Sequence, residues 1–420
     1  MKLAILGADE DSLDLIRWEV SQNGAGQGAH ELVAAYDSDP FAEQLRALAP
    51  QIRLNQSWEE LAVASSADAV IIGRGGKYLT DETGIDHTER RADQLRKLVQ
   101  AAVPMIVVCP ACEAIVGFEI EMIRRDVGAI IVPYVAGASN PVINLLSNLA
   151  AMNESSEIGM IEQVFFEREQ ADRGRDAVRL RFSRDVTLLR GVIGFVQAVT
   201  ASGPPVAVGR DPLGPKPKDL PSLANLSVFL GGSEGLNARW SIAPTAGADQ
   251  ARLILVGQRG RAVASMPGDH DWSLEVMGPK RTTKTFSAQA GTEDVFLHLA
   301  NEMARGDAKT FDLWHSFCRD QEAAEAVDRS LARGRTIELF NEQHTEEDSF
   351  KGIMAMGGCF LLVLSLGFVF LAAIVEGLQL PMREWRIWQP WPFYLLIPLG
   401  AFLLLQFLQL AIKRDAPAAN

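Results

Sequence analysis

The chain has 420 residues, which is enough for about two globular domains of ~100–200 residues each. Its content of 48% hydrophobic and 22% charged residues is typical of a folded protein and excludes a wholly disordered or collagen-like chain. Acidic residues (53) outnumber Lys and Arg (40), and the resulting net charge of −13 disfavours a nucleic-acid partner. Four cysteines in a chain of this length cannot form a disulfide scaffold, so we expect a reducing compartment.

The first 135 residues alternate between short apolar runs and helix-like runs. This alternation is typical of a parallel sheet with crossover helices, so we predict an α/β fold with a Rossmann-like, doubly wound domain over residues 1–135. The expected strands are Lys2–Leu6, Glu31–Tyr36, Ala69–Ile72, Met105–Cys109 and Ala129–Tyr134. The expected helices are Ser12–Ser21, Pro40–Leu48, Trp58–Ala64, Asp86–Ala102 and Ala114–Asp126.

Residues 136–340 have a different pattern, in which long β-rich runs come first and helices follow. We therefore predict a separate α+β domain over this range. Its expected strands are Ile158–Glu167, Leu226–Leu230, Ala238–Ile242, Ala251–Val256 and Thr336–Leu339. The expected helices are Glu293–Arg305 and Phe311–Arg333, and the Gly- and Pro-rich stretch Gly203–Pro221 is expected to be an exposed loop.

Two long uncharged stretches follow, Gly352–Val375 and Pro392–Ile412. Each has about the 20 apolar residues that a helix needs to cross a bilayer, and the segment between them holds three tryptophans (Trp385, Trp388 and Trp391). We therefore predict a transmembrane hairpin over residues 352–412, with a tether at 341–351 and a tail at 413–420. The alternative is a buried pair of helices in a large soluble core.

The N-terminus has no long apolar run of the kind found in signal peptides. Two spans would place both ends of the chain on one side of the membrane. We accordingly expect a multi-pass protein of the cell membrane with its soluble domains in the cytoplasm.

The order of elements over residues 1–340 resembles the Gfo/Idh/MocA oxidoreductases. The similarity is carried by MKLAILG, AAYDSDP, SWEEL with ADAVIIG, His87 with Glu89, and the closing EAVDRSLARGRTIEL. It implies an NAD(P)-binding Rossmann domain followed by an α+β domain with an open sheet that faces the substrate. The implied chemistry is hydride transfer between a nicotinamide and a carbon that bears a sugar hydroxyl.

A dinucleotide fold needs the pattern G-x-G-x-x-G after its first strand, because the backbone and a helix N-terminus must approach the pyrophosphate. The sequence here is Gly7-Ala8-Asp9-Glu10-Asp11-Ser12, which keeps only the first glycine. Three successive carboxylates would repel the pyrophosphate, so NAD is a possible cofactor whose binding we expect to be weak or absent. The alternative role for Asp9 or Asp11 is to cap the following helix.

Further candidates for cofactor binding follow other strands. Asp37 ends the second strand, where such folds place the carboxylate that binds the adenosine ribose and favours NAD over NADP; an ordinary turn residue is the alternative. Gly73, Arg74 and Gly75 form a loop whose backbone could approach a ligand and whose arginine could meet a phosphate or carboxylate. A flexible loop with a solvated arginine is the alternative there.

Catalysis in the family is implied to use a lysine of an E-K-P motif and a histidine of the second domain. The equivalent stretch here is Val107-Val108-Cys109-Pro110-Ala111-Cys112-Glu113, and no lysine occurs between Lys97 and Lys216. No histidine occurs between His87 and His270. A hydride cannot leave a hydroxylated carbon unless a group accepts the hydroxyl proton, so the usual reaction is improbable.

Replacement groups for catalysis are weak candidates: His87, Glu113, Cys109 and Cys112. The two cysteines form a C-x-x-C pair before a helix, which is either a redox pair or two thiols that fill space. His87 and Glu89 match a family position beside the cofactor, and their alternative role is to match the charge of a helix N-terminus. Trp314 and His315 have the spacing of a core stripe, and no metal site is expected.

Three functions remain open. The first is a binding protein with weakened or lost catalysis, whose ligand is a nucleotide or a sugar-like molecule. The second is a membrane-attached NAD-dependent oxidoreductase that acts on a sugar or polyol. The third is a scaffold subunit of a membrane complex. The expected partners are the lipid bilayer, such a ligand, and either a second copy of the chain or a membrane protein.

Overall fold

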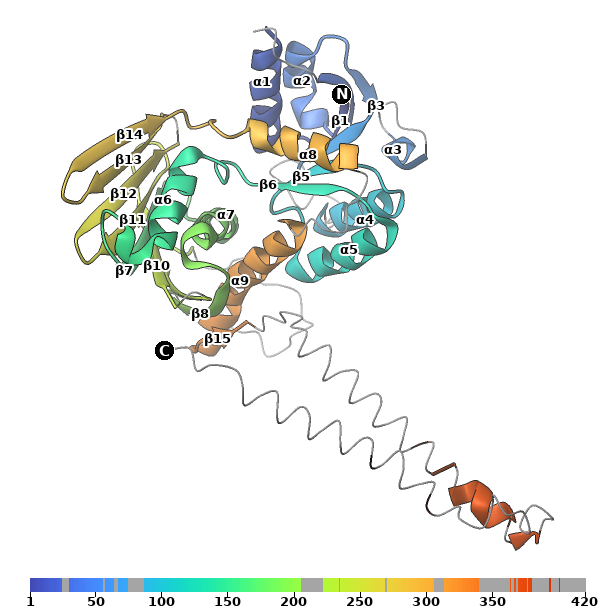
Figure 1. Cartoon of the computed structure of the whole chain (residues 1–420). Helices are drawn as coiled ribbons and strands as arrows, with labels where there is room; N and C mark the ends of the chain where they lie inside the picture. The colour runs from blue at the N-terminus through green and yellow to red at the C-terminus, as the bar shows by residue number, and fades with distance from the viewer. Residues whose placement is uncertain are drawn as a thin grey trace. The chain divides into compact units, whose positions relative to one another are not determined.

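The computed structural model describes residues 1–24, 30–55, 57–63, 67–74, 87–204, 222–233, 235–268, 270–305 and 313–339, together with short stretches between 363 and 400. The chain divides into two compact units, Met1–Phe340 and Asn341–Asn420. All elements discussed below belong to the first unit (Figure 1).

The first sheet has six strands in the order β3-β2-β1-β4-β5-β6, and all neighbours are parallel. The strands are β1 (Lys2–Leu6), β2 (Glu31–Tyr36), β3 (Arg53–Asn55), β4 (Ala69–Ile72), β5 (Met105–Val108) and β6 (Ile131–Tyr134). Strand β1 lies between β2 and β4, so the chain winds outward from β1 in both directions. The predicted doubly wound Rossmann-like sheet is confirmed.

Helices cover both faces of this sheet. One face packs against α1 (Glu10–Gly24), α2 (Ala42–Leu48) and α8 (Glu293–Arg305) in one hydrophobic cluster. The other packs against α3 (Glu60–Val63), α4 (His87–Gln100), α5 (Ala114–Val127) and α9 (Leu313–Arg333). Because α8 and α9 come after eight of the nine strands of the second sheet in the chain, residues far beyond 135 complete the core of the first sheet.

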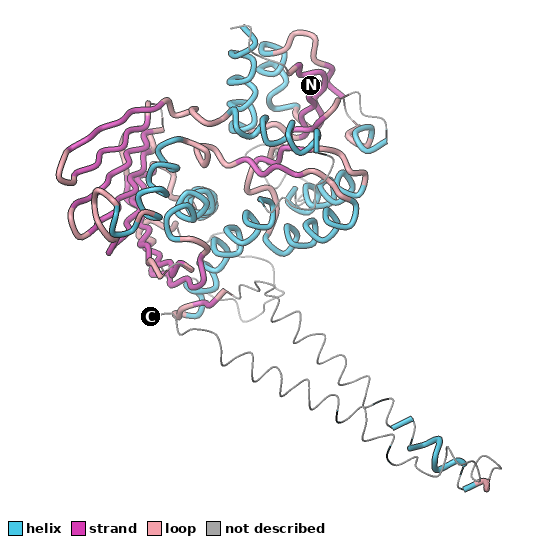
Figure 2. Tube along the Cα trace, viewed as in Figure 1, coloured by secondary structure: helices cyan, strands magenta, loops and turns pink. Residues whose placement is uncertain are grey.

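The second sheet has nine strands in the order β14-β13-β12-β11-β7-β10-β9-β8-β15 and is mixed (Figure 2). Its strands are β7 (Ile161–Gln170), β8 (Val196–Ser202), β9 (Ser227–Gly232), β10 (Asn237–Pro244), β11 (Gln250–Gly257), β12 (Gly260–Pro267), β13 (Trp272–Met277), β14 (Arg281–Phe286) and β15 (Ile337–Glu338). Most of them are antiparallel to their neighbours, and β7 with β10 is the parallel pair.

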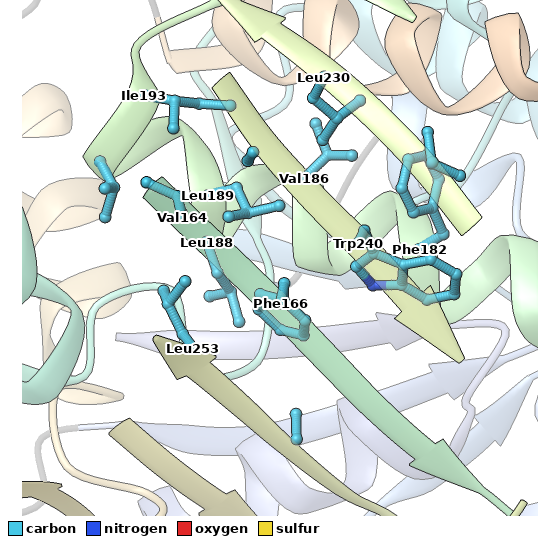
Figure 3. Packing of buried hydrophobic residues seen from close by; sticks show 14 of the residues in the cluster. Val164, Phe166, Phe182, Val186, Leu188, Leu189, Ile193, Leu230, Trp240 and Leu253 are labelled. Atoms are coloured by element: carbon cyan, nitrogen blue, oxygen red, sulfur yellow. The ribbon is translucent and has the colours of Figure 1, made fainter. Parts of the chain in front are cut away.

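Helices α6 (Pro141–Ala151), α7 (Arg175–Ile193) and part of α9 cover one face of the second sheet. Figure 3 shows the packing beneath α7, where Phe182 lies against Trp240 with ring centroids 5.0 Å apart. Phe166 from β7 is also fully buried there. This core fixes the position of α7, which carries one of the residues of the candidate site.

The expected fold class and location require a correction for residues 341–420. In the part of this unit that the structure describes, the longest helical run covers residues 369–375, and no helix is long and apolar enough to cross a bilayer. The prediction of two transmembrane helices in a cell-membrane protein with cytoplasmic domains is therefore wrong on this finding. A bilayer span requires a continuous helix of about 20 residues, and the described residues of the two apolar stretches do not form one.

The tether 341–351, the tail 413–420 and most of the two apolar stretches lie outside the described residues, as do Trp385, Trp388 and Trp391.

Candidate functional site

The strand order of the first sheet reverses between β1 and β4, and ligands of such folds bind at this point beyond the carboxyl ends of the strands. Gly7 follows β1 and donates its N–H to the Tyr36 carbonyl at 2.8 Å. Gly73 follows β4 and donates its N–H to the Leu6 carbonyl at 3.0 Å. The two predicted glycines thus lie together at this edge.

Both positions require glycine. Gly7 has φ +66°, and a Cβ atom there would lie 1.8 Å from Nη2 of Arg91. A Cβ atom on Gly73 would lie 2.2 Å from the Gly7 carbonyl oxygen. The two glycines therefore allow β1 and β4 to end close together and leave room for the Arg91 side chain.

Asp9 caps helix α1. It accepts a hydrogen bond from the Ser12 N–H at 2.8 Å through Oδ1, while its own N–H donates to the Ser12 Oγ at 2.8 Å. Ala8 donates its N–H to the Ser38 Oγ at 3.0 Å. The N–H groups of Ala8, Asp9 and Ser12 at this helix start are therefore paired within the chain.

Two arginines neutralise the carboxylates of this loop. Arg74 donates from Nε to Oδ2 of Asp9 at 2.8 Å and from its backbone N–H to the same oxygen at 3.1 Å. Arg74 also donates from Nη2 to Oδ2 of Asp11, and Arg184 of α7 donates from its Nη2 to that oxygen. We call these four residues (Asp9, Asp11, Arg74 and Arg184) the crevice network.

The charges of the crevice network are largely removed from water. Asp9 is 5% exposed and Arg184 is 7% exposed. Burial opposes ionisation of Asp11, but Arg184 and Arg74 overcome it and hold the pKa of that carboxyl below its usual value. Burial lowers the pKa of Arg184, and Asp11 counteracts this effect. The network is therefore a set of buried, mutually dependent ion pairs.

Arg91 of α4 is a further buried cation beside Gly7. Burial lowers the pKa of Arg91 to about 10, and the charges of Asp37 and Asp9 counteract this effect. Its Nε and Nη1 have no hydrogen-bond partner among the residues that the structure describes. The sequence alone did not indicate Arg91 and Arg184 as site residues, because their partners are distant in the chain.

Asp37 lies after β2 with φ +48°, which is a turn conformation. Its carboxylate accepts from Nη2 of Arg90 at 2.8 and 2.9 Å and from Nε2 of Gln94 at 2.6 Å. The oxygens predicted to bind a ribose are thus occupied by helix α4.

The C-x-x-C pair is buried behind β5. Burial raises the pKa of Cys109 well above its usual value and raises the pKa of Cys112 to about 12. A reactive redox thiol needs the opposite shift. Cys318 of α9 lies close to Cys112, because both sulfur atoms lie near Gly117. A Cβ atom built on Gly117 would be 2.7 Å from the Cys318 Sγ and 3.9 Å from the Cys112 Sγ. No group of three or more metal-ligating side chains occurs among the described residues.

The remaining candidates are spread apart. Glu113 is exposed at the start of α5, and Glu89 is exposed in the first turn of α4. Gly75 and the His87 side chain lie outside the described residues. Trp314 is fully buried and donates to the Gly117 carbonyl at 3.0 Å, as expected for a core stripe.

The residues at this edge of the first sheet fit a dinucleotide only in part. Gly7 fits one, because its positive φ gives the tight turn that the first glycine of a dinucleotide loop makes. Asp9 and Asp11 do not, because their carboxylates occupy the helix start where a pyrophosphate would bind and are held by the chain's own arginines. Asp37 stands at the strand end where a ribose-binding carboxylate is expected, but Arg90 and Gln94 hold its oxygens. An internal ion-pair network fills the position where folds of this type bind a pyrophosphate.

No protein-family model matches the sequence, and no curated protein sequence matches it. Solved structures do match. An oxidoreductase from Agrobacterium radiobacter in complex with NAD+, L-tartaric acid and magnesium is 15% identical, covers 80% of this chain and 98% of its own, and gives a TM-score of 0.56. An oxidoreductase from Thermotoga maritima is 14% identical, covers 80% of this chain and 98% of its own, and gives a TM-score of 0.60.

A third match is the WlbA dehydrogenase from Chromobactrium violaceum in complex with NADH and UDP-GlcNAcA. It is 12% identical, covers 81% of this chain and 96% of its own, and gives a TM-score of 0.57. NAD as a possible cofactor is consistent with these neighbours. The predicted resemblance is confirmed at the level of architecture: the chain has the fold of the Gfo/Idh/MocA-type oxidoreductases.

Proposed function

We propose that the chain is a ligand-binding protein built on a dehydrogenase fold, in which NAD-dependent hydride transfer is weakened or lost. The observation that supports this proposal most strongly is the crevice network, which fills the expected pyrophosphate position with carboxylates of the chain itself. A dinucleotide would have to displace these buried pairs before it could reach the start of α1. Breaking a buried pair costs about 3–5 kcal/mol, so a displaced network would lower the affinity for NAD by orders of magnitude.

The sequence adds a second argument. The lysine and histidine that the family resemblance implies for proton transfer have no counterparts. The residues after β5 in their place are buried thiols with raised pKa values, which are poor proton acceptors at neutral pH. We therefore propose that the ligand occupies the crevice as a nucleotide or sugar-like molecule that is bound and not oxidised.

An NAD-dependent oxidoreductase that acts on a sugar or polyol is the second candidate. The positive φ of Gly7 favours it, because the first glycine of a dinucleotide loop makes this tight turn. This candidate requires the crevice network to open when the cofactor binds.

A binding and activity assay separates the two candidates. NADH fluorescence is titrated against the full chain. The reduction of NAD+ is followed at about 340 nm, where the reduced nicotinamide absorbs, with myo-inositol as the polyol. We expect no saturable micromolar binding and no reduction above the rate without protein. Saturable binding together with NADH formation would establish the oxidoreductase and overturn the proposal.

A further inference from the structure

Several arginines gather around Asp11, although the chain as a whole carries a net charge of −13. Three arginines, Arg184, Arg74 and Arg181, act on the charge of Asp11. Arg181 has a weak partner of its own, because its Nη2 lies 3.5 Å from Oδ2 of Asp249. This concentration of guanidinium groups provides N–H donors that an anionic group can use.

Arg184 also has an unused donor. Its Nε is buried and has no hydrogen-bond partner in the described part of the chain, whereas its Nη2 binds Asp11. A guanidinium has five N–H donors in a planar fork that matches a carboxylate or phosphate. Buried donors are normally paired, so an unpaired one next to the Asp11 carboxylate indicates a missing acceptor.

The surroundings of Arg184 place it at the ligand-binding edge of the first sheet. Its charge acts on Cys109, directly after β5, and on Tyr134, the last residue of β6. Burial raises the pKa of Tyr134 to about 12, so this side chain is a neutral hydroxyl at physiological pH. The side chain from α7 thus reaches the carboxyl ends of the strands, where folds of this type bind ligands.

We propose that the crevice binds a small ligand with a carboxylate or phosphate group, that Arg184 anchors this group, and that Asp11 occupies the anchor when the ligand is absent. The inference rests on the proposed function and names the chemical class of its ligand. The ligand's oxygens take the free Nε of Arg184 and replace Oδ2 of Asp11 at Nη2. A neutral polyol has no charged oxygen with which to compete for this guanidinium.

Isothermal titration calorimetry of the full chain tests the inference, with inorganic phosphate and L-tartrate as probes and myo-inositol as the neutral comparison. Ionic strength is held constant with sodium chloride, and no dinucleotide is present. We expect saturable binding of at least one anion and none of myo-inositol. The anion that binds distinguishes a phosphate ligand from a carboxylate ligand.

Two variants should shift the affinity in opposite directions. Arg184→Gln removes the anchor and should weaken anion binding by about tenfold or more. Asp11→Asn removes the internal competitor and should tighten anion binding. The matched control is Arg179→Gln, because Arg179 lies on the same helix, is paired with Asp328 at 3.2 Å and is about two-fifths exposed. The Arg179→Gln variant should bind the anion with an affinity within about twofold of that of the wild type.

The inference is overturned if neither anion binds saturably to the wild-type chain, or if Arg184→Gln and Arg179→Gln weaken binding equally. If Arg184→Gln fails to fold, Asp11→Asn decides, and unchanged or weaker anion binding by that variant contradicts the inference. Since dinucleotide is absent throughout, these results are independent of the NADH titration that tests the proposed function.

Discussion

Arg184 and Asp11 are 173 positions apart in the chain, yet they form a buried ion pair. Asp11 belongs to the first turn of α1, and Arg184 belongs to α7, which packs on the second sheet. The pair therefore joins the layers built on the two sheets at the edge where a ligand would bind. Its breakage would expose the helix start and free a guanidinium in the same step.

Asp185 is a fully buried carboxylate next to Arg184 in sequence, and we predict that its neutralisation destabilises the protein. Its Oδ2 accepts from Nε of Arg168 at 2.9 Å and from Nε1 of Trp240 at 2.8 Å. Asp185→Asn would leave the Arg168 charge unpaired, which should lower the free energy of unfolding by about 3 kcal/mol. Urea denaturation measures this change, and the exposed Asp176→Asn on the same helix should change it by less than about 0.5 kcal/mol. Equal losses in the two variants would contradict the account.

Asp320 should make stability depend on pH. Burial raises the pKa of Asp320 to about 6, and Arg190, whose Nη1 lies 2.9 Å from Oδ2, offsets this only in part. Because the folded pKa exceeds the unfolded value, the stabilising contribution of the bound proton is present at low pH and is lost as pH rises through about 6. Between about pH 5 and pH 7.5 this loss amounts to about 1 kcal/mol.

The Asp320→Asn variant provides the readout, since it cannot titrate at this position. We expect its free energy of unfolding, measured in urea, to rise relative to wild type by about 1 kcal/mol from about pH 5 to pH 7.5. A constant difference across this range would show that Asp320 does not titrate as described.

The cysteines behind β5 should be inert in the native protein. Cys109, Cys112 and Cys318 are buried, and burial raises the pKa of each thiol. Iodoacetamide at about pH 8 should therefore leave them unmodified in the folded chain and should modify them in urea, because only the thiolate reacts. Peptide mass spectrometry measures both states. Rapid native modification of Cys109 or Cys112 would support the redox pair instead.

The sequence predicts most of the first sheet because its strands are short apolar runs. β1, β2 and β4 coincide with the expected ranges, whereas β3 was missed because Arg53–Asn55 is short and polar. Helix α7 was missed for a different reason. Its buried residues include Arg175, Arg184 and Asp185, so charges interrupt the apolar periodicity that marks a helix in the sequence.

The candidate site was predictable where neighbours in the chain build it. Gly7, Asp9 and Asp37 follow strands, and the capping role of Asp9 depends on Ser12, three residues away. The crevice network was not predictable, because Arg74 and Arg184 reach Asp11 across 63 and 173 positions. Only the folded chain shows that the carboxylates unfavourable to a pyrophosphate are neutralised by arginines of the chain itself.

The central claim is that the chain's own carboxylates, above all Asp9, keep a dinucleotide from the start of α1. Titration of NADH by calorimetry against wild type, Asp9→Gly and Asp14→Asn tests this claim most directly. Asp14 lies on the same helix, is paired with Arg17 and controls for the change in net charge. We predict that Asp9→Gly binds NADH at least about tenfold more tightly than wild type, because Ser12 N–H and Arg74 become available, and that Asp14→Asn binds like wild type. Micromolar binding by wild type that Asp9→Gly does not improve would contradict the account.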